Sequence, residues 1–109
     1  MNQEILDHIE KTRSENPKVR HNALKEMCPC HVKADIDLFW NRIFEMVSDE
    51  DDNVRWQVLH TICDGSPLHL ENKVADALEV FNRDPNSMIR RRAHKALGSY
   101  LRTGKWNVL

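Results

Sequence analysis

The sequence predicts an all-α protein built from three stacked helical hairpins, and three observations support this prediction. The chain repeats itself at a step of 35 residues, because an aliphatic residue followed by arginine occurs at 19–20, 54–55 and 89–90. Apolar residues recur at helical spacing along nearly the whole chain. Strand patterns and hairpin turn signals are missing, and the chain has only three glycines and four prolines. A period of this length is typical of stacked helical hairpins.

The first unit, residues 1–30, is expected to contain two helices, over about 3–12 and 17–28. Pro17 suits the first turn of the second helix, where its missing N–H costs no hydrogen bond. The apolar residues of the first helix are Ile5, Leu6 and Ile9, and those of the second are Val19, Ala23, Leu24 and Met27.

The second unit, residues 31–65, repeats this organisation. Asp35 or Asp37 is expected to cap its first helix, and Asn53 is expected to open its second. The apolar stripe of the first helix is Ile36, Phe39, Trp40, Ile43, Met46 and Val47, and the second helix turns Val54, Val58, Leu59 and Ile62 inward.

The third unit, residues 66–104, is expected to have helices over about 70–82 and 87–102, followed by a tail over 105–109. The apolar residues of these helices are Val74, Ala77, Leu78 and Phe81, then Ile89, Ala93, Leu97 and either Tyr100 or Leu101. The tail carries Trp106, Val108 and Leu109. It is expected to cover the open end of the last repeat, and the alternative is a docking peptide for another subunit.

The 109 residues are expected to form one domain, 1–109, because such a chain can bury one continuous core. A net charge of -1 gives no overall attraction to nucleic acid or to a membrane surface. No segment approaches a bilayer span, and the first residues have neither a basic leader nor an apolar run. Three cysteines, an odd count, predict reduced thiols, and a cytoplasmic location is expected.

Two of the repeats share a longer motif. Asp49 precedes Arg55 by six residues, and Asp84 precedes Arg90 by the same distance. With the aliphatic residue before each arginine, this pattern resembles the HEAT repeat. The resemblance implies a right-handed α-solenoid with its second helices on the concave side. The ladder of hydrogen bonds that it implies between units comprises Arg20, Asp49, Arg55, Asp84 and Arg90.

The first unit departs from the motif, because Ser14 stands where the aspartate is expected, six residues before Arg20. Residues 64–69 are similar to the start of an ankyrin repeat, which is the alternative to HEAT-like repeats. That segment has no equivalent one step earlier in the chain.

The phase of the repeat predicts which residues of the second helices point away from the core. With 19, 23 and 27 buried, positions 21, 22 and 25 and their equivalents should face outward. They form three columns: His21, Trp56 and Arg91; Asn22, Gln57 and Arg92; and Lys25, His60 and Lys95. None of these nine residues is acidic, so we expect this surface to attract an anionic partner.

An exposed Trp56 would contribute nothing to folding, and tryptophan and arginine are enriched at binding hot spots. The predicted function is therefore a non-enzymatic protein-interaction or adaptor module. It would bind an acidic segment of another protein, with Trp56 as the anchor. One alternative is that Trp56 packs across a neighbouring helix. Another is nucleic-acid binding, with the arginines on phosphates and Trp56 stacked on a base.

Charge is distributed unevenly along the chain. Residues 35–53 contain seven acids and one base, whereas the segment from 88 to the end contains six bases and no acid. Self-association of the acidic middle with the basic end is one hypothesis. The other is that 49–52 is a solvated turn whose charges favour the next helix N-terminus.

Four residues raise the question of a metal or thiol site: Cys28, Cys30, His31 and Cys63. Zinc requires about four ligands, and the spacing matches no common zinc motif. Cysteine is also a frequent small core residue, so no metal and no cofactor are expected. There is no glycine-rich phosphate loop, nucleophile elbow or His-Glu-x-x-His motif, and an enzyme is not predicted.

Overall fold

The computed structural model describes residues 3–27 and 36–108, and within them the chain is all-helical, as predicted. Six α-helices and one 3₁₀ turn occur in these residues, and no strand does. The elements are α1 (Gln3–Lys11), α2 (Pro17–Glu26), α3 (Asp37–Glu45), α4 (Asp52–Gly65), η1 (Leu68–Leu70), α5 (Glu71–Phe81) and α6 (Ser87–Thr103). The ranges predicted for α1, α5 and α6 agree with these to within one residue at each end, and α2 begins at Pro17 as predicted, whereas its predicted end at residue 28 lies outside the described residues.

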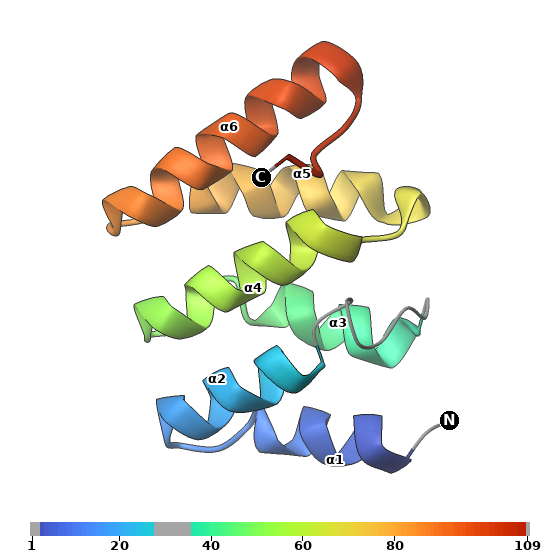
Figure 1. Cartoon of the computed structure of the whole chain (residues 1–109), viewed down its shortest axis with the longest axis vertical. Coiled ribbons are helices and arrows are strands. Elements are labelled where there is room, and N and C mark those ends of the chain that lie inside the picture. Colours follow the sequence, from blue (N-terminus) through green and yellow to red (C-terminus); the bar gives the residue numbers. More distant parts are fainter. Residues whose placement is uncertain (1–2, 28–35, 109) are drawn as a thin grey trace.

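Neighbouring helices pack as pairs: α1 on α2, α3 on α4 and α5 on α6. The pairs lie one above another along the longest dimension of the molecule, which measures 39 × 28 × 19 Å (Figure 1). The second helices contact one another in order, α2 against α4 and α4 against α6. Helix α4 is therefore covered on two flanks, whereas α2 and α6 each have one flank without such a neighbour.

Side chains cap all three second helices. Asn16 accepts a hydrogen bond from the N–H of Lys18 at the start of α2, and Pro17 occupies the first turn as predicted. Asn86 does the same for α6. For α4 the predicted opening residue is wrong: Asp51 caps the helix by accepting from the N–H of Val54. Asp51 places its carboxylate three residues before that donor, the usual spacing for an N-cap.

The cap predicted for α3 is not formed by Asp37, which is the first helical residue itself. The backbone at Ile36 precedes it in an extended conformation and provides no side-chain hydrogen bond. The carboxylate of Asp37 still lies in the first turn, where negative charge is favourable. The other candidate, Asp35, lies outside the described residues.

The core follows the predicted apolar stripes with two exceptions. Val54 and its equivalent Ile89 are 0% and 1% exposed, but Val19 is 37% exposed. Val19 was expected to be buried. It is exposed because α2 has no second helix before it in the stack to cover the flank on which Val19 lies. Leu6 is also 37% exposed, although it was placed on the apolar face of the first helix.

Helix α6 ends at Thr103, and Gly104 caps it with a left-handed backbone (φ 77°). Trp106 is then buried, and its ring centroid lies 5.8 Å from that of Tyr100. Trp106 and Cys63 line the same hollow near the end of α4, and Val108 and Trp56 line another. The tail therefore packs on the side where α4 meets α6. Of the two predicted core residues, Tyr100 packs against the core and Leu101 is exposed.

No helix in the described part of the chain combines the length and the apolar character needed to cross a bilayer.

Candidate functional site

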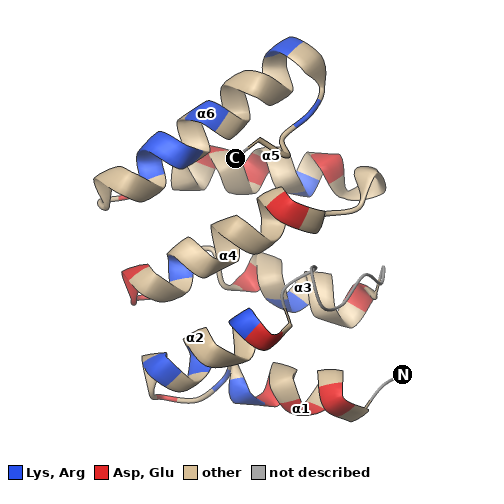
Figure 2. Cartoon of the chain, in the orientation of Figure 1, with Lys and Arg blue, Asp and Glu red and all other residues tan. Residues whose placement is uncertain are grey.

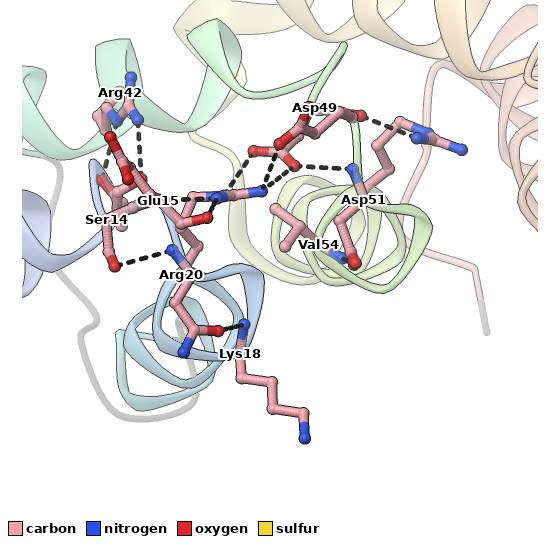
Figure 3. Close-up of polar contacts among 12 residues, drawn as sticks. Ser14, Glu15, Lys18, Arg20, Arg42, Asp49, Asp51 and Val54 are labelled. Atoms are coloured by element: carbon pink, nitrogen blue, oxygen red, sulfur yellow. Dashed lines mark hydrogen bonds and ion pairs between the residues drawn. The ribbon is translucent and has the colours of Figure 1, made fainter.

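Two arginine–aspartate pairs form a ladder that joins successive hairpins, and Figure 3 shows the first of them, Arg20 with Asp49. Arg20 donates from Nε and Nη2 to the carboxylate of Asp49, at 3.0 Å each. Arg55 donates from the same atoms to Asp84, at 2.7 and 3.2 Å. Each pair spans 29 residues, and its side chains are at most 12% exposed. Two parallel bonds at one carboxylate fix both distance and orientation between hairpins.

Each ladder arginine also binds its own hairpin. The Nη1 groups of Arg20, Arg55 and Arg90 donate to the carbonyl oxygen six residues earlier, at 2.9, 2.8 and 2.7 Å. Both aspartates accept a further bond from the N–H two residues later, which closes the turn before the helix. The ladder thus links the turn of one hairpin to the second helix of the hairpin before it.

Ser14 closes the turn before its helix, as the two aspartates do, but it has no carboxylate that could bind an arginine of another hairpin. Its hydroxyl accepts from the N–H of Asn16 at 3.1 Å, as the aspartates do in the other units. Its carbonyl accepts from Arg20. A carboxylate at position 14 would pair with an arginine of a preceding hairpin, so serine at this position removes no bond from the ladder seen here.

The nine predicted surface residues do not form one continuous site. Six of them are divided between two hollows, and a seventh, Gln57, is buried at 9% exposure, which corrects the prediction. Gln57 lies on the middle helix α4, whereas its equivalent Asn22 on α2 is exposed. The difference arises because α2 packs against α4 and covers that flank. Lys25 and His60 line neither hollow.

The larger hollow has a volume of about 330 Å³ and lies between α4 and α6. Its lining residues are Trp56, Met88, Arg91, Arg92, Lys95 and Val108. Four of these were predicted from the repeat, and no acid is among them. Met88 and Val108 were not predicted. Met88 is 62% exposed, and only its place in the first turn of α6 could have indicated this from the sequence.

Trp56 and Arg92 contact each other across the two helices. Cζ of Arg92 lies 5.4 Å from the centroid of the Trp56 ring, within the range of a cation–π interaction. Trp56 is therefore half-buried against a neighbouring helix, which is the alternative considered for it, while one part of its surface still lines the hollow.

Two nitrogens of Arg92, Nε and Nη2, are buried and have no oxygen acceptor among the described residues. The thiol of Cys63 lies beside this guanidinium and is a weak acceptor for it. Burial raises the pKa of the Cys63 thiol, and the positive charge of Arg92 and its hydrogen bond to the thiol offset part of that shift. A buried donor without an acceptor is destabilising, and its occurrence calls for an explanation.

The second hollow, of about 280 Å³, lies between the starts of α2 and α4. Its lining residues are Pro17, Lys18, His21, Asn22, Asp51 and Asn53. The carboxylate of Asp51 thus adds an acid beside two of the predicted residues. Because of this negative charge, the second hollow is less favourable for an anion than the α4–α6 hollow, whose lining contains no acid.

Acidic residues gather at the start of α4 (Figure 2), and hydrogen bonds within the chain engage most of those in the turn before this helix. Asp49 binds Arg20, Asp51 caps α4, and Asp52 accepts from Asn86 at 3.0 Å. Glu50, with a side chain 86% exposed, makes a long contact of 3.8 Å with Arg20. These bonds account for the acid cluster without a second copy of the chain.

Of the candidate metal ligands, Cys28, Cys30 and His31 lie outside the described residues. Cys63 is completely buried. Within residues 3–27 and 36–108, no group of three His, Cys, Asp or Glu side chains is arranged to hold a metal ion.

No protein-family model, no curated protein and no solved structure matches this chain.

Proposed function

We propose that the chain is a short HEAT-like α-solenoid that acts as a non-enzymatic protein-interaction module. Two features support the solenoid: the same arginine–aspartate pair recurs one repeat later, and each second helix packs on the next. In such arrays each repeat contacts its neighbours, and the stacked helices present an extended surface for binding.

The hollow between α4 and α6 is the observation that carries the binding function. It combines an aromatic face, two apolar side chains and three cationic side chains, with no acid in its lining. Its residues come from two helices and the tail, so the folded chain holds them together. This combination suits a protein segment that carries both negative charge and an apolar side chain.

Nucleic-acid binding through the same face is the competing function. Phosphate binding favours cations spread along the path of the backbone. Here the cations of the hollow all come from α6, and Asp51 lies beside the other hollow. The distribution therefore favours a short acidic segment of a protein over a polyanion.

The test is capture of a partner from a nuclease-treated lysate of the source cells by the tagged chain. The partner is then purified, and its affinity for the chain is measured directly. We expect Trp56→Ala combined with Arg92→Glu to weaken that affinity by at least about tenfold, because both changes fall in the hollow. Helical circular dichroism should remain, since the ladder residues are untouched.

Arg83→Glu is the matched control. It makes the same charge reversal in the turn that follows α5, at a side chain that is 81% exposed and outside the hollow. Its affinity should equal that of the unaltered chain. Equal affinity of the Trp56/Arg92 variant and the control would refute the assigned surface. A gel band retarded by nucleic acid at low salt, and lost steeply as salt rises, would favour the competing function.

A further inference from the structure

Three arginines of this chain can be compared by the edge of the guanidinium that carries Nε and Nη2. In Arg20 and Arg55 this edge holds an aspartate through two parallel hydrogen bonds. The Nη1 group of each also donates to a backbone carbonyl, so all three nitrogens of each guanidinium are hydrogen-bonded. In this fold, therefore, the Nε–Nη2 edge is a carboxylate-binding group.

Arg92 has the same edge without a carboxylate. Its Nε and Nη2 are buried and have no oxygen acceptor within the described part of the chain. The guanidinium is instead placed over the ring of Trp56 and beside the thiol of Cys63, and Arg92 is one of the residues that line the hollow. Turning this side chain toward the hollow would give up only the weak hydrogen bond to the thiol, and a bound carboxylate would supply the oxygen acceptors that both nitrogens lack.

The rest of the lining defines what accompanies the carboxylate. Trp56, Met88 and Val108 offer apolar contact, and Met88 is largely exposed in the free chain. Arg91 and Lys95 add positive charge at the same hollow. A volume of about 330 Å³ is at the lower end of the range for small-molecule sites, and fits one or two side chains of a peptide.

We propose that this hollow recognises a carboxylate side chain next to an apolar residue in a protein segment, and that Arg92 binds the carboxylate bidentately through Nε and Nη2. This inference rests on the proposed function and specifies its ligand. The flat fork of two N–H groups matches the two oxygens of a planar carboxylate. Trp56 and Met88 then receive the neighbouring apolar side chain.

The test uses three synthetic peptides and the full chain labelled with ¹⁵N. The probes are acetyl-Leu-Asp-Leu-amide, its asparagine counterpart, and its phosphoserine counterpart. The NMR signals to follow are the Nε–H of Arg92, identified by its loss in Arg92→Lys, and the indole N–H of Trp56. We expect the aspartate peptide to shift both signals in a saturable way, and the asparagine peptide to leave the Arg92 signal unchanged.

Two conservative variants separate fork geometry from charge. Arg92→Lys keeps the positive charge but loses the fork, so the aspartate peptide should bind at least about tenfold more weakly. Arg83→Lys is the control, because the side chain of Arg83 is 81% exposed and lies outside the hollow; the affinity of this variant should equal that of the unaltered chain. Equal affinity of Arg92→Lys and the unaltered chain would overturn the proposal.

Two other outcomes would also overturn it: no saturable shift with the aspartate peptide, or tighter binding of the phosphoserine peptide by tenfold or more. Failure of the inference is distinguishable from failure of the proposed function. If the partner from the lysate is lost in the Trp56/Arg92 variant but bound normally by Arg92→Lys, the surface is correct and the bidentate carboxylate is wrong.

Discussion

Arg55 and Asp84 lie 29 residues apart and form two parallel hydrogen bonds, at 2.7 and 3.2 Å, with side chains that are 12% and 5% exposed. The carboxylate of Asp84 also accepts from the N–H of Asn86 at 2.8 Å. One aspartate thus closes the turn of its own hairpin and holds the arginine of the hairpin before it. The position of each hairpin is tied to that of its neighbour.

Breaking this pair is expected to be costly. Arg55→Ala leaves the carboxylate of Asp84 buried without its counter-ion, and we expect a loss of about 3 kcal/mol in the free energy of unfolding. The measurement is equilibrium unfolding in urea. Arg83→Ala, which removes an exposed arginine from a 3.9 Å contact with Glu79, should change stability by less than about 0.5 kcal/mol. Similar losses in the two variants would contradict a structural role for the ladder.

Duplication of residues 31–65 tests the repeat itself. In the longer chain, Arg55 of the first copy would meet Asp49 of the second copy, as Arg20 meets Asp49 now. Because each hairpin contacts only its neighbours, the added unit should fold. We expect a monomer whose helical circular dichroism rises in proportion to its length and whose unfolding midpoint does not fall. An aggregated chain, or an inserted unit cut readily by protease, would contradict the repeat assignment.

His8 gives the first hairpin a pH-dependent contact. Its Nδ1 lies 2.6 Å from the carbonyl oxygen of Glu4, and its Nε2 contacts the carboxylate of Glu26. Both partners are acceptors, so the charged imidazolium, which donates from both nitrogens, fits best. The hydrogen bond to the Glu4 carbonyl raises the pKa of His8 above 6.5; burial opposes this, and Glu26 adds to it.

A folded-state pKa above the unfolded value means that this contact stabilises the fold fully below about pH 6.5 and loses its effect as pH rises through the folded-state pKa. We expect the unaltered chain to exceed His8→Gln in melting temperature at pH 5.5, with a smaller difference at pH 8.5. Glu26→Gln should reduce the difference at pH 5.5. A gap that is independent of pH would show that His8 acts only by packing.

The tail is expected to be part of the fold. Trp106 is 5% exposed and contacts the ring of Tyr100, so Trp106→Ala should lower the free energy of unfolding by about 3 kcal/mol through lost burial and the cavity left behind. Leu101→Ala, at a side chain that is 75% exposed, should be close to neutral. Thermal unfolding by calorimetry would measure both. A neutral Trp106→Ala would mean that the tail does not pack in solution.

The candidate site was predictable in part. The phase of the repeat placed Trp56, Arg91, Arg92 and Lys95 on one side of the second helices, and all four line the α4–α6 hollow. The same phase placed Gln57 there, and it is buried. Helical phase says which way a side chain leaves its own helix, and it does not say whether a neighbouring helix covers that direction.

The sequence by itself determined the helices, their order and the spacing of 35 residues, because these depend on local apolar periodicity and turn residues. Tertiary structure decided what each flank of a helix meets. It buried Gln57 under α2 and exposed Val19 at the open end of the stack. It also placed Arg92 over Trp56 with two buried nitrogens that have no oxygen acceptor among the described residues. These outcomes depend on contacts between residues far apart in the chain, which exist only when the hairpins are stacked.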